Sequence, residues 1–342
     1  MLDRHTAFAY SGALHEHVLF SPALQDNPLG DPAARTLVVY TPPGYDDNPT
    51  RHYPSIYVIQ GYTGQVSMWW NRTPFKEPYP KVVDDLFASD HVPPCLVVYV
   101  DAWTRYGGSQ YVDSAGTGKY HTYLCQDVVP FVDAHYRTID HASQRGIQGK
   151  SSGGFGAMIT PMLRPDLFGG LATHAGDTLY ELCYGNEFGK ATRLLRNWNG
   201  SPEDWWADFT SRAAFTNPAD MTLLGLYGVA ACFSPDERGR PLLPFNTTSG
   251  RILEEVWARW LAWDPVRMVP AHQDALRGLR AIWVDAGRND EYFLDLGAQA
   301  FVDELASIGI HDVHFELFEG GHGGIDHRYP RSLAFLAKRL QP

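Results

Sequence analysis

Three residues whose side chains together can attack the carbonyl carbon of an acyl compound occur in this chain in the order Ser, Asp, His. Ser151 lies in the pentapeptide Gly149-Lys150-Ser151-Ser152-Gly153, Asp290 follows in a polar turn, and His322 lies among glycines near the C-terminus. A serine hydroxyl attacks a carbonyl at neutral pH only when a base such as imidazole takes its proton, and a carboxylate can hold that imidazole in the correct tautomer. These residues therefore predict acyl-transfer chemistry.

The pentapeptide has the G-x-S-x-G pattern of a sharp turn that joins a strand to a helix. Gly149 and Gly153 lack the β-carbons that would keep strand and helix apart. Residues 145–148 predict the strand, and residues 155–159 predict a helix that Pro161 should kink or end. The backbone amide of Ser152 and the positive end of this helix would point to the position of an oxyanion.

Three carboxylates are candidates for the acid that orients the histidine. Asp285, Asp290 and Glu291 all follow the apolar run 281–284, which predicts a strand, and open α/β sheets place their chemistry at the carboxyl ends of strands. We favour Asp290 because it lies in the loop beyond the strand, whereas Asp285 belongs to the strand end and would anchor the turn. Glu291 begins the next helix, where the helix dipole alone favours a carboxylate.

His322 is the favoured base among the 14 histidines. The alternation of residues 312–318 predicts a half-buried strand, and the four glycines around His322 predict a loop from which the imidazole can reach outward. His327, five residues further on, is the alternative.

Several segments, taken in their order along the chain, resemble the putative-esterase branch of the α/β-hydrolase superfamily. That branch includes S-formylglutathione hydrolases, feruloyl esterases, enterochelin esterases and antigen 85 mycolyltransferases. The resemblance implies an α/β-hydrolase fold, with a mostly parallel central sheet flanked by helices. It implies that Ser151 is the nucleophile, Asp290 the acid and His322 the base, and that Tyr62 supplies a second oxyanion N–H. The segments are 37–45, 57–62, 96–101, 133–138, the pentapeptide, 285–290 and Gly321-His322.

Residues 176–275 do not have the pattern of a sheet and predict a helical cap inserted between two core segments, 1–175 and 276–342. We expect tryptophans of this region to hold the cap to the core and at least one to reach the pocket. Trp69 and Trp70, just after the proposed oxyanion loop, are better placed to bind substrate. The cap tryptophans are Trp198, Trp205, Trp206, Trp257, Trp260 and Trp263.

Two further segments with a recognisable pattern precede the pentapeptide. Residues 106–114 form a polar loop that either lies at the rim of the site or is an ordinary connection. Residues 120–135 have the apolar spacing of an amphipathic helix.

Composition limits the class of partner. The chain has 28 basic and 39 acidic residues, a net charge of −11, which disfavours nucleic acids, anionic membranes and polyanionic substrates. No apolar run reaches the roughly 18 residues of a membrane span, and the first residues lack a secretory signal, so we expect a cytoplasmic location. The spacing of the four cysteines indicates buried thiols rather than disulfides or a zinc site. We expect no metal and no cofactor, and a homo-oligomer is possible.

These observations favour a serine carboxylesterase that hydrolyses small neutral esters through an acyl-enzyme. An acyltransferase or a peptidase on the same three residues is the alternative, because both share this chemistry. A non-catalytic binding protein on a hydrolase scaffold is less favoured, because Ser151, Asp290 and His322 are all present.

Overall fold

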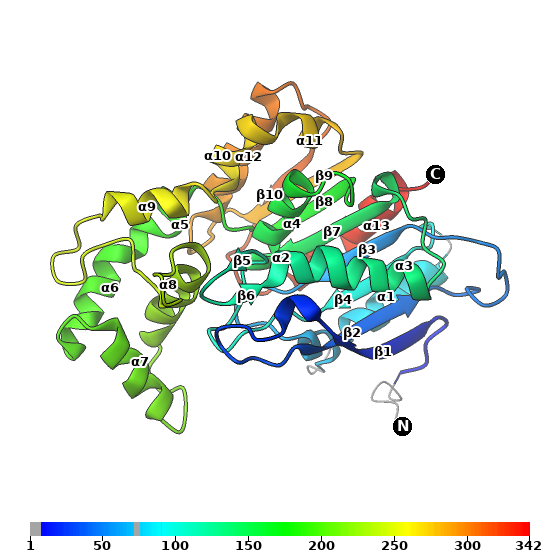
Figure 1. Cartoon of the computed structure of the whole chain (residues 1–342). Helices are drawn as coiled ribbons and strands as arrows, with labels where there is room; N and C mark the ends of the chain where they lie inside the picture. Colours follow the sequence, from blue (N-terminus) through cyan, green and yellow to red (C-terminus); the bar gives the residue numbers. More distant parts are fainter. Residues whose placement is uncertain (1–7, 72–75, 90) are drawn as a thin grey trace.

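The computed structural model describes residues 8–71, 76–89 and 91–342. An eight-stranded sheet runs through it in the order β1-β2-β4-β3-β7-β8-β9-β10 (Figure 1). The six strands from β4 to β10 run parallel, and β2 runs antiparallel to both β1 and β4, which confirms the mostly parallel sheet. The strands are β1 (Ala13–Phe20), β2 (Ala34–Thr41), β3 (Ser55–Ile59), β4 (Leu96–Val100), β7 (Arg145–Lys150), β8 (Gly170–His174), β9 (Ala281–Gly287) and β10 (His314–Phe318); β5 (Asp113–Ser114) and β6 (Gly118–Lys119) form a separate small sheet.

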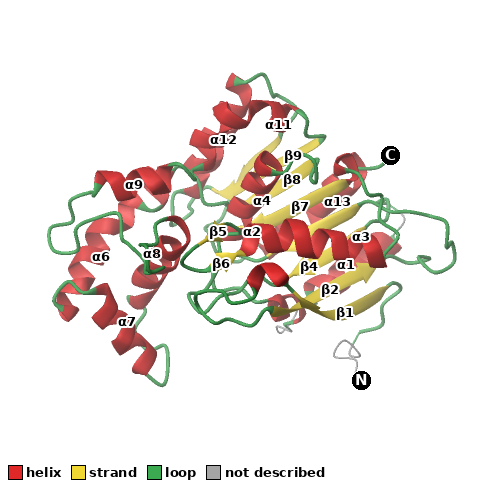
Figure 2. Cartoon of the chain, in the orientation of Figure 1, coloured by secondary structure: helices red, strands yellow, loops and turns green. Residues whose placement is uncertain are grey.

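Helices cover both faces of the large sheet (Figure 2). Successive residues of a strand point to opposite faces, so Val39 and Ile59 join one apolar core while Val38 and Val58 join another. The first core contains α3 (Val129–His135), α4 (Ser152–Leu163) and α12 (Leu294–Ser307). The second contains α1 (Tyr79–Ala88) and α13 (Tyr329–Arg339).

The predicted helix over residues 120–135 forms, but its centre is not α-helical. It consists of α2 (Tyr120–Thr122), a π-helical segment (Tyr123–Val128) and α3. Pro130 has no N–H to donate, and the N–H of Val129 bonds back five residues to the carbonyl of Leu124.

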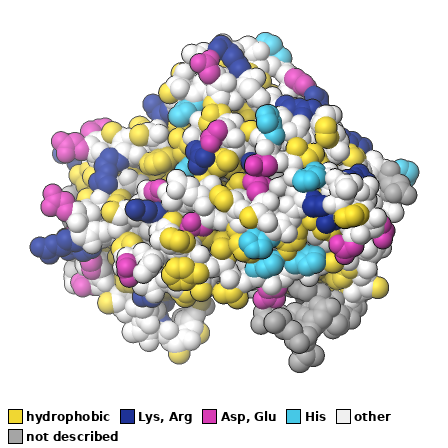
Figure 3. Space-filling model, turned by 45° about the vertical axis from the view of Figure 1, so that its right-hand side comes forward, with side chains coloured by type: hydrophobic (Ala, Val, Ile, Leu, Met, Phe, Trp, Pro, Cys, Tyr) yellow, Lys and Arg dark blue, Asp and Glu magenta, His cyan; other side chains and the backbone are white. Residues whose placement is uncertain are grey.

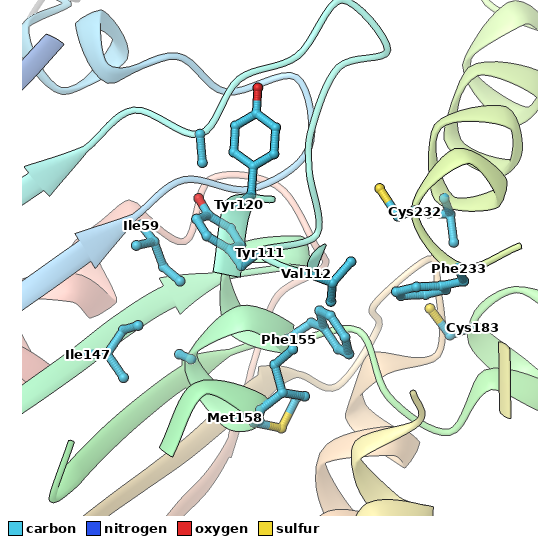
Figure 4. Packing of buried hydrophobic residues seen from close by; sticks show 14 of the residues in the cluster. Ile59, Tyr111, Val112, Tyr120, Ile147, Phe155, Met158, Cys183, Cys232 and Phe233 are labelled. Carbon is cyan, nitrogen blue, oxygen red and sulfur yellow. The ribbon is translucent and has the colours of Figure 1, made fainter. Parts of the chain in front are cut away.

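The chain between β8 and β9 forms the α-helices α5 (Tyr180–Cys183), α6 (Phe188–Leu195), α7 (Pro202–Ser211), α8 (Asp220–Phe233), α9 (Glu254–Leu261), α10 (Pro265–Met268) and α11 (Gln273–Arg277). Helices α10 and α11 pack near α12 and α4, whereas α5 to α9 form a group that stands beside the sheet, at the left of Figure 1. Aromatic contacts join it to the core: Phe233 of α8 packs on Phe155 of α4 at a centroid distance of 5.6 Å, and Cys183 of α5 lies in the same cluster (Figure 4). The division of the chain at residues 176 and 275 stays a prediction.

Polar contacts inside this helical region fix its geometry. The buried carboxylate of Asp264 accepts hydrogen bonds from the N–H groups of Leu179 (3.0 Å) and Tyr180 (2.9 Å). Trp205 donates its indole N–H to Asp220 at 3.0 Å, and the indole of Trp260 donates to a serine hydroxyl at 2.7 Å. Because a buried indole N–H usually finds such a partner, these two tryptophans serve the packing of the helices on one another. In the described residues no helix is long and apolar enough to cross a membrane.

Candidate active site

Ser151 lies at a strained turn between β7 and α4. Its backbone has φ 57° and ψ −127°, a region that non-glycine residues rarely occupy, and such strain concentrates at functional sites. A β-carbon on Gly149 would come within 2.4 Å of Gly153, and one on Gly153 would come within 2.7 Å of the Ile59 carbonyl. Both glycines are therefore required by close approach, as the pentapeptide predicts. Helix α4 continues past Pro161 and ends at Leu163.

Loops after β9 and β10 bring Asp290 and His322 to this turn. Backbone bonds join the two loops, including Asn289 N–H to the Gly320 carbonyl at 2.9 Å. The Nε2 atom of His322 lies 3.1 Å from Ser151 Oγ, and its Nδ1 atom lies 2.9 Å from Asp290 Oδ2. The structure thus brings together the three residues that the sequence singled out, although 139 and 32 positions separate them along the chain.

The other two candidate acids have different surroundings. Glu291 does not contact the imidazole of His322; its Oε2 accepts the backbone N–H of that residue at 2.7 Å, which holds the loop. Asp285 lies in β9, fully buried, and accepts bonds from His174 (2.6 Å) and Arg328 (2.9 Å). The remaining candidate base, His327, is exposed and bonds to the carbonyl of Gly324 at 3.3 Å.

A second carboxyl group, that of Asp177, approaches Ser151 from the loop after β8. Its Oδ1 lies 3.4 Å from Ser151 Oγ, and its Oδ2 accepts hydrogen bonds from the hydroxyl groups of Ser152 (3.0 Å) and Tyr184 (2.7 Å). Burial raises the pKa of Asp177 above its usual value, although the hydroxyl contacts and His322 oppose the shift. Sequence reasoning missed this residue; its place at the carboxyl end of β8, beside the serine turn, was the available signal.

Ser151 and His322 open onto a cavity of about 770 Å³ between the sheet and the helical region. Part of its lining comes from α8, with Met221, Leu226 and Val229, and another part comes from the loop after β3. Tyr292 forms part of the rim, and its ring meets the His322 ring edge-on at a centroid distance of 5.0 Å. The volume falls in the usual range for small-molecule sites.

The loop after β3 lies against the serine turn, where a second oxyanion donor is expected. A β-carbon on Gly61 would be 3.4 Å from the Ser151 β-carbon, and Tyr62 and Ser152 line the same cavity. The Tyr62 side chain points elsewhere: its hydroxyl lies 2.6 Å from the Leu224 carbonyl of α8 and 2.8 Å from that of Tyr106. This phenol therefore ties α8 to the loop at residues 106–114, and Gln110 of that loop also lines the cavity.

The expected substrate contacts of Trp69 and Trp70 are corrected by the structure. Trp69 is only 4% exposed and packs against Tyr329 and Tyr79 in the second core, and Trp70 packs on Tyr99. No tryptophan is among the described residues that line the cavity, so the expectation that a cap tryptophan reaches it is also wrong. The short helix at Val66–Trp70 turns both indoles back toward the sheet and leaves Met68 at the cavity.

The cavity contains a thiol that does not compete with the serine. Cys183 lines it, but burial raises the pKa of this thiol well above its usual value. The thiolate is the nucleophilic form of cysteine, so a thiol held protonated is a poor nucleophile. All four cysteines are buried and free of disulfides, as the sequence indicates.

Comparisons with known proteins show the family and the fold of this chain. Residues 32–330 match the model of a family described as "Putative esterase". A curated relative, an uncharacterized protein of Corynebacterium glutamicum, is 26% identical over 145 residues, which are 42% of this chain. The match spans about a third of that relative's length, 33%.

Solved structures share the fold along nearly the whole chain. A ferulic acid esterase superposes with a TM-score of 0.61 at 20% identity, and the match covers 97% of this chain and 100% of that one. An S-formylglutathione hydrolase from Agrobacterium tumefaciens superposes with a TM-score of 0.57 at 15% identity, covering 98% of each chain. These likenesses establish the α/β-hydrolase fold. The family match covers most of the sequence, and the chain therefore belongs to the family described as "Putative esterase".

Proposed function

We propose that this protein is a serine carboxylesterase that hydrolyses small neutral esters through an acyl-enzyme on Ser151. The observation that carries the proposal is the unbroken series of contacts at the cavity wall, from Ser151 Oγ to His322 Nε2 at 3.1 Å and from His322 Nδ1 to Asp290 at 2.9 Å. The family match and the names of the structural neighbours support ester substrates.

In the first half of the reaction, His322 takes the proton of Ser151 as Oγ attacks the ester carbonyl. Asp290 stabilises the imidazolium that forms, because its carboxylate faces Nδ1. The N–H groups of Ser152 and Tyr62 would donate to the oxyanion, aided by the positive end of α4. The imidazolium then gives its proton to the leaving alcohol, and the acyl group stays on Ser151.

Water completes the cycle by the same steps. His322 takes a proton from water, the resulting hydroxide attacks the acyl-enzyme, and the proton passes to Ser151 Oγ as the acid leaves. Asp290 also accepts the backbone N–H of Tyr292 at 2.9 Å. This second bond fixes the carboxylate, so the imidazole keeps one orientation through both halves of the reaction.

The cavity lining supports small neutral substrates with an apolar group. Met68, Met221, Leu226, Val229 and Tyr292 offer apolar surface, and burying apolar area contributes roughly 25 cal/mol per Å². Charged groups of both signs are interspersed on the molecular face in Figure 3. In the cavity the carboxyl groups of Glu187, Glu291 and Asp326 outnumber the ammonium groups of Lys150 and Lys190. Such a site disfavours anionic esters.

The proposal is tested by the hydrolysis of nitrophenyl acetate and butyrate. Ser151→Ala should lower turnover by about 10⁴-fold. Ser332→Ala is the matched control, since Ser332 Oγ also lies near a histidine nitrogen, His174 Nε2 at 2.8 Å, but is buried away from the cavity. The control should retain turnover per folded molecule. Activity that survives in Ser151→Ala would refute the proposed function.

A further inference from the structure

The two oxygens of the Asp177 carboxyl group have different surroundings: Oδ2 accepts hydrogen bonds, and Oδ1 faces the hydroxyl oxygen of Ser151. Two hydroxyl groups, of Ser152 and Tyr184, donate to Oδ2, while Oδ1 faces Ser151 Oγ at 3.4 Å. This distance is longer than the usual 2.5–3.0 Å of an O–H···O bond, but catalytic contacts are commonly long in a free enzyme and shorten in the complex.

The surroundings fix the position of this carboxyl group. The N–H of Asp177 bonds to the Ser151 carbonyl at 3.3 Å, and the Ser151 N–H lies 3.1 Å from the carbonyl of Ala175. Asp264 holds the following backbone, at Leu179 and Tyr180. Asp177 is 5% exposed, and it lines the cavity. The serine turn and the loop after β8 therefore form one rigid unit.

Proton counting decides which form of Asp177 suits this geometry. Ser151 has one hydroxyl proton, and His322 needs it at Nε2. An ionised Asp177 would then place a negative oxygen against the Ser151 lone pairs. A protonated Asp177, with the proton on Oδ1, would donate to Ser151 Oγ instead, and each hydroxyl and carboxyl group of the network would have a partner.

We propose that Asp177 acts as a neutral carboxylic acid whose Oδ1–H donates to Ser151 Oγ and stabilises the negative charge that develops on this oxygen. The charge develops when His322 removes the serine proton and again when Oγ leaves the acyl group. The proton stays on Asp177 throughout, so His322 remains the base. The inference extends the proposed function, since it assigns a further residue to the same nucleophile.

The groups that face Asp177 come from four elements and agree with a neutral acid. Tyr180, Cys183 and Tyr184 approach from α5, and burial raises the pKa of each well above its usual value, so all three stay uncharged. Tyr292, from the loop after β9, is likewise uncharged because burial raises its pKa. His322, from the loop after β10, and Ser151 and Ser152, at the start of α4, complete the set.

The experiment measures the rate at which a fluorophosphonate labels Ser151, together with ester turnover, across the pH range. Both rates should fall on the alkaline side as Asp177 ionises. Asp177→Asn keeps a neutral donor and should lose the alkaline fall while remaining faster than Asp177→Ala. Asp177→Ala has no donor and should lower both rates by about 10- to 100-fold, the loss expected for a hydrogen bond to a charged group.

Two further variants separate Asp177 from its neighbours. The Tyr184 hydroxyl lowers the pKa of Asp177, so Tyr184→Phe should move the alkaline fall to higher pH. Burial lowers the pKa of Lys150, which lines the same cavity, and the alkaline fall should persist in Lys150→Gln. Three results would overturn the inference. The wild-type rates would not fall at alkaline pH, the alkaline fall would stay at the same pH in Tyr184→Phe, or Asp177→Asn would be as slow as Asp177→Ala.

The labelling rate keeps this inference separate from the proposed function. An enzyme that hydrolyses no ester, yet whose labelling responds to Asp177 as described, would refute the esterase proposal and leave the role of Asp177 intact. If esters are hydrolysed at Ser151 but neither turnover nor labelling changes in the Asp177 variants, the proposed function stands and the role of Asp177 is refuted.

Discussion

The Oδ1 atom of Asp285 lies 2.6 Å from Nδ1 of His174, and neither side chain is exposed to solvent. With Ser332 Oγ at 2.8 Å from the other ring nitrogen, this is a second Ser-His-Asp arrangement in the molecule. It lies inside the core, where Ser332 also bonds to Gln148 and Asp285 to Arg328. Of the two arrangements, the one at Ser151 opens onto the cavity, so access to substrate distinguishes them.

The two aspartates should therefore respond differently to the same substitution. Asp290→Asn should lower turnover by about 10⁴-fold, because the amide favours the wrong tautomer of the His322 imidazole. The free energy of unfolding should change little. Asp285→Asn should lower the free energy of unfolding by about 1.5–3 kcal/mol, because His174 and Arg328 lose a charged acceptor while Arg328 keeps its ion pair with Glu316, with turnover per folded molecule retained. Urea unfolding and active-site titration measure both. Equal turnover losses with unchanged stability would contradict the assignment.

The stabilising effect of Asp285 should depend on pH. Burial alone raises the pKa of this carboxyl group, but His174, Trp283 and Arg328 outweigh burial and lower it. Because the unfolded chain binds the proton more readily, the stabilisation is present above the usual carboxyl pKa, about 3.9, and is lost as pH falls through the lower value of the folded protein. The difference in unfolding free energy between wild type and Asp285→Asn should shrink below about pH 4. A constant difference would show that the contacts do not act through ionisation.

Much of the site could be predicted because local sequence constrains it. Gly149 and Gly153 are needed at the turn whatever surrounds it, and Asp290 could be preferred to Asp285 from its place beyond the strand. Trp69 and Trp70 could not be placed, because a short helical turn decides which way an indole points. Asp177 was missed because its contact with Ser151 depends on the pairing of β7 with β8 and on the path of the loop that follows.

Trp69 and Tyr292 should separate stability from substrate binding. Trp69→Ala should lower the free energy of unfolding by about 3–5 kcal/mol and leave KM unchanged, because this indole packs in the core. Tyr292→Ala should raise KM for aryl esters by about 2- to 10-fold, the equivalent of one aromatic contact. Leu296→Ala is a control, since Leu296 is 47% exposed and does not line the cavity. A raised KM in Trp69→Ala at unchanged stability would restore that residue to the binding site.

The most direct test of the central claim, that Ser151 is the nucleophile activated by His322, is peptide mass spectrometry after reaction with a fluorophosphonate. We expect one adduct per chain, located on Ser151, and a large loss of labelling in His322→Ala but not in His327→Ala. An adduct on Ser152, or labelling of Ser151 that does not depend on His322, would contradict it.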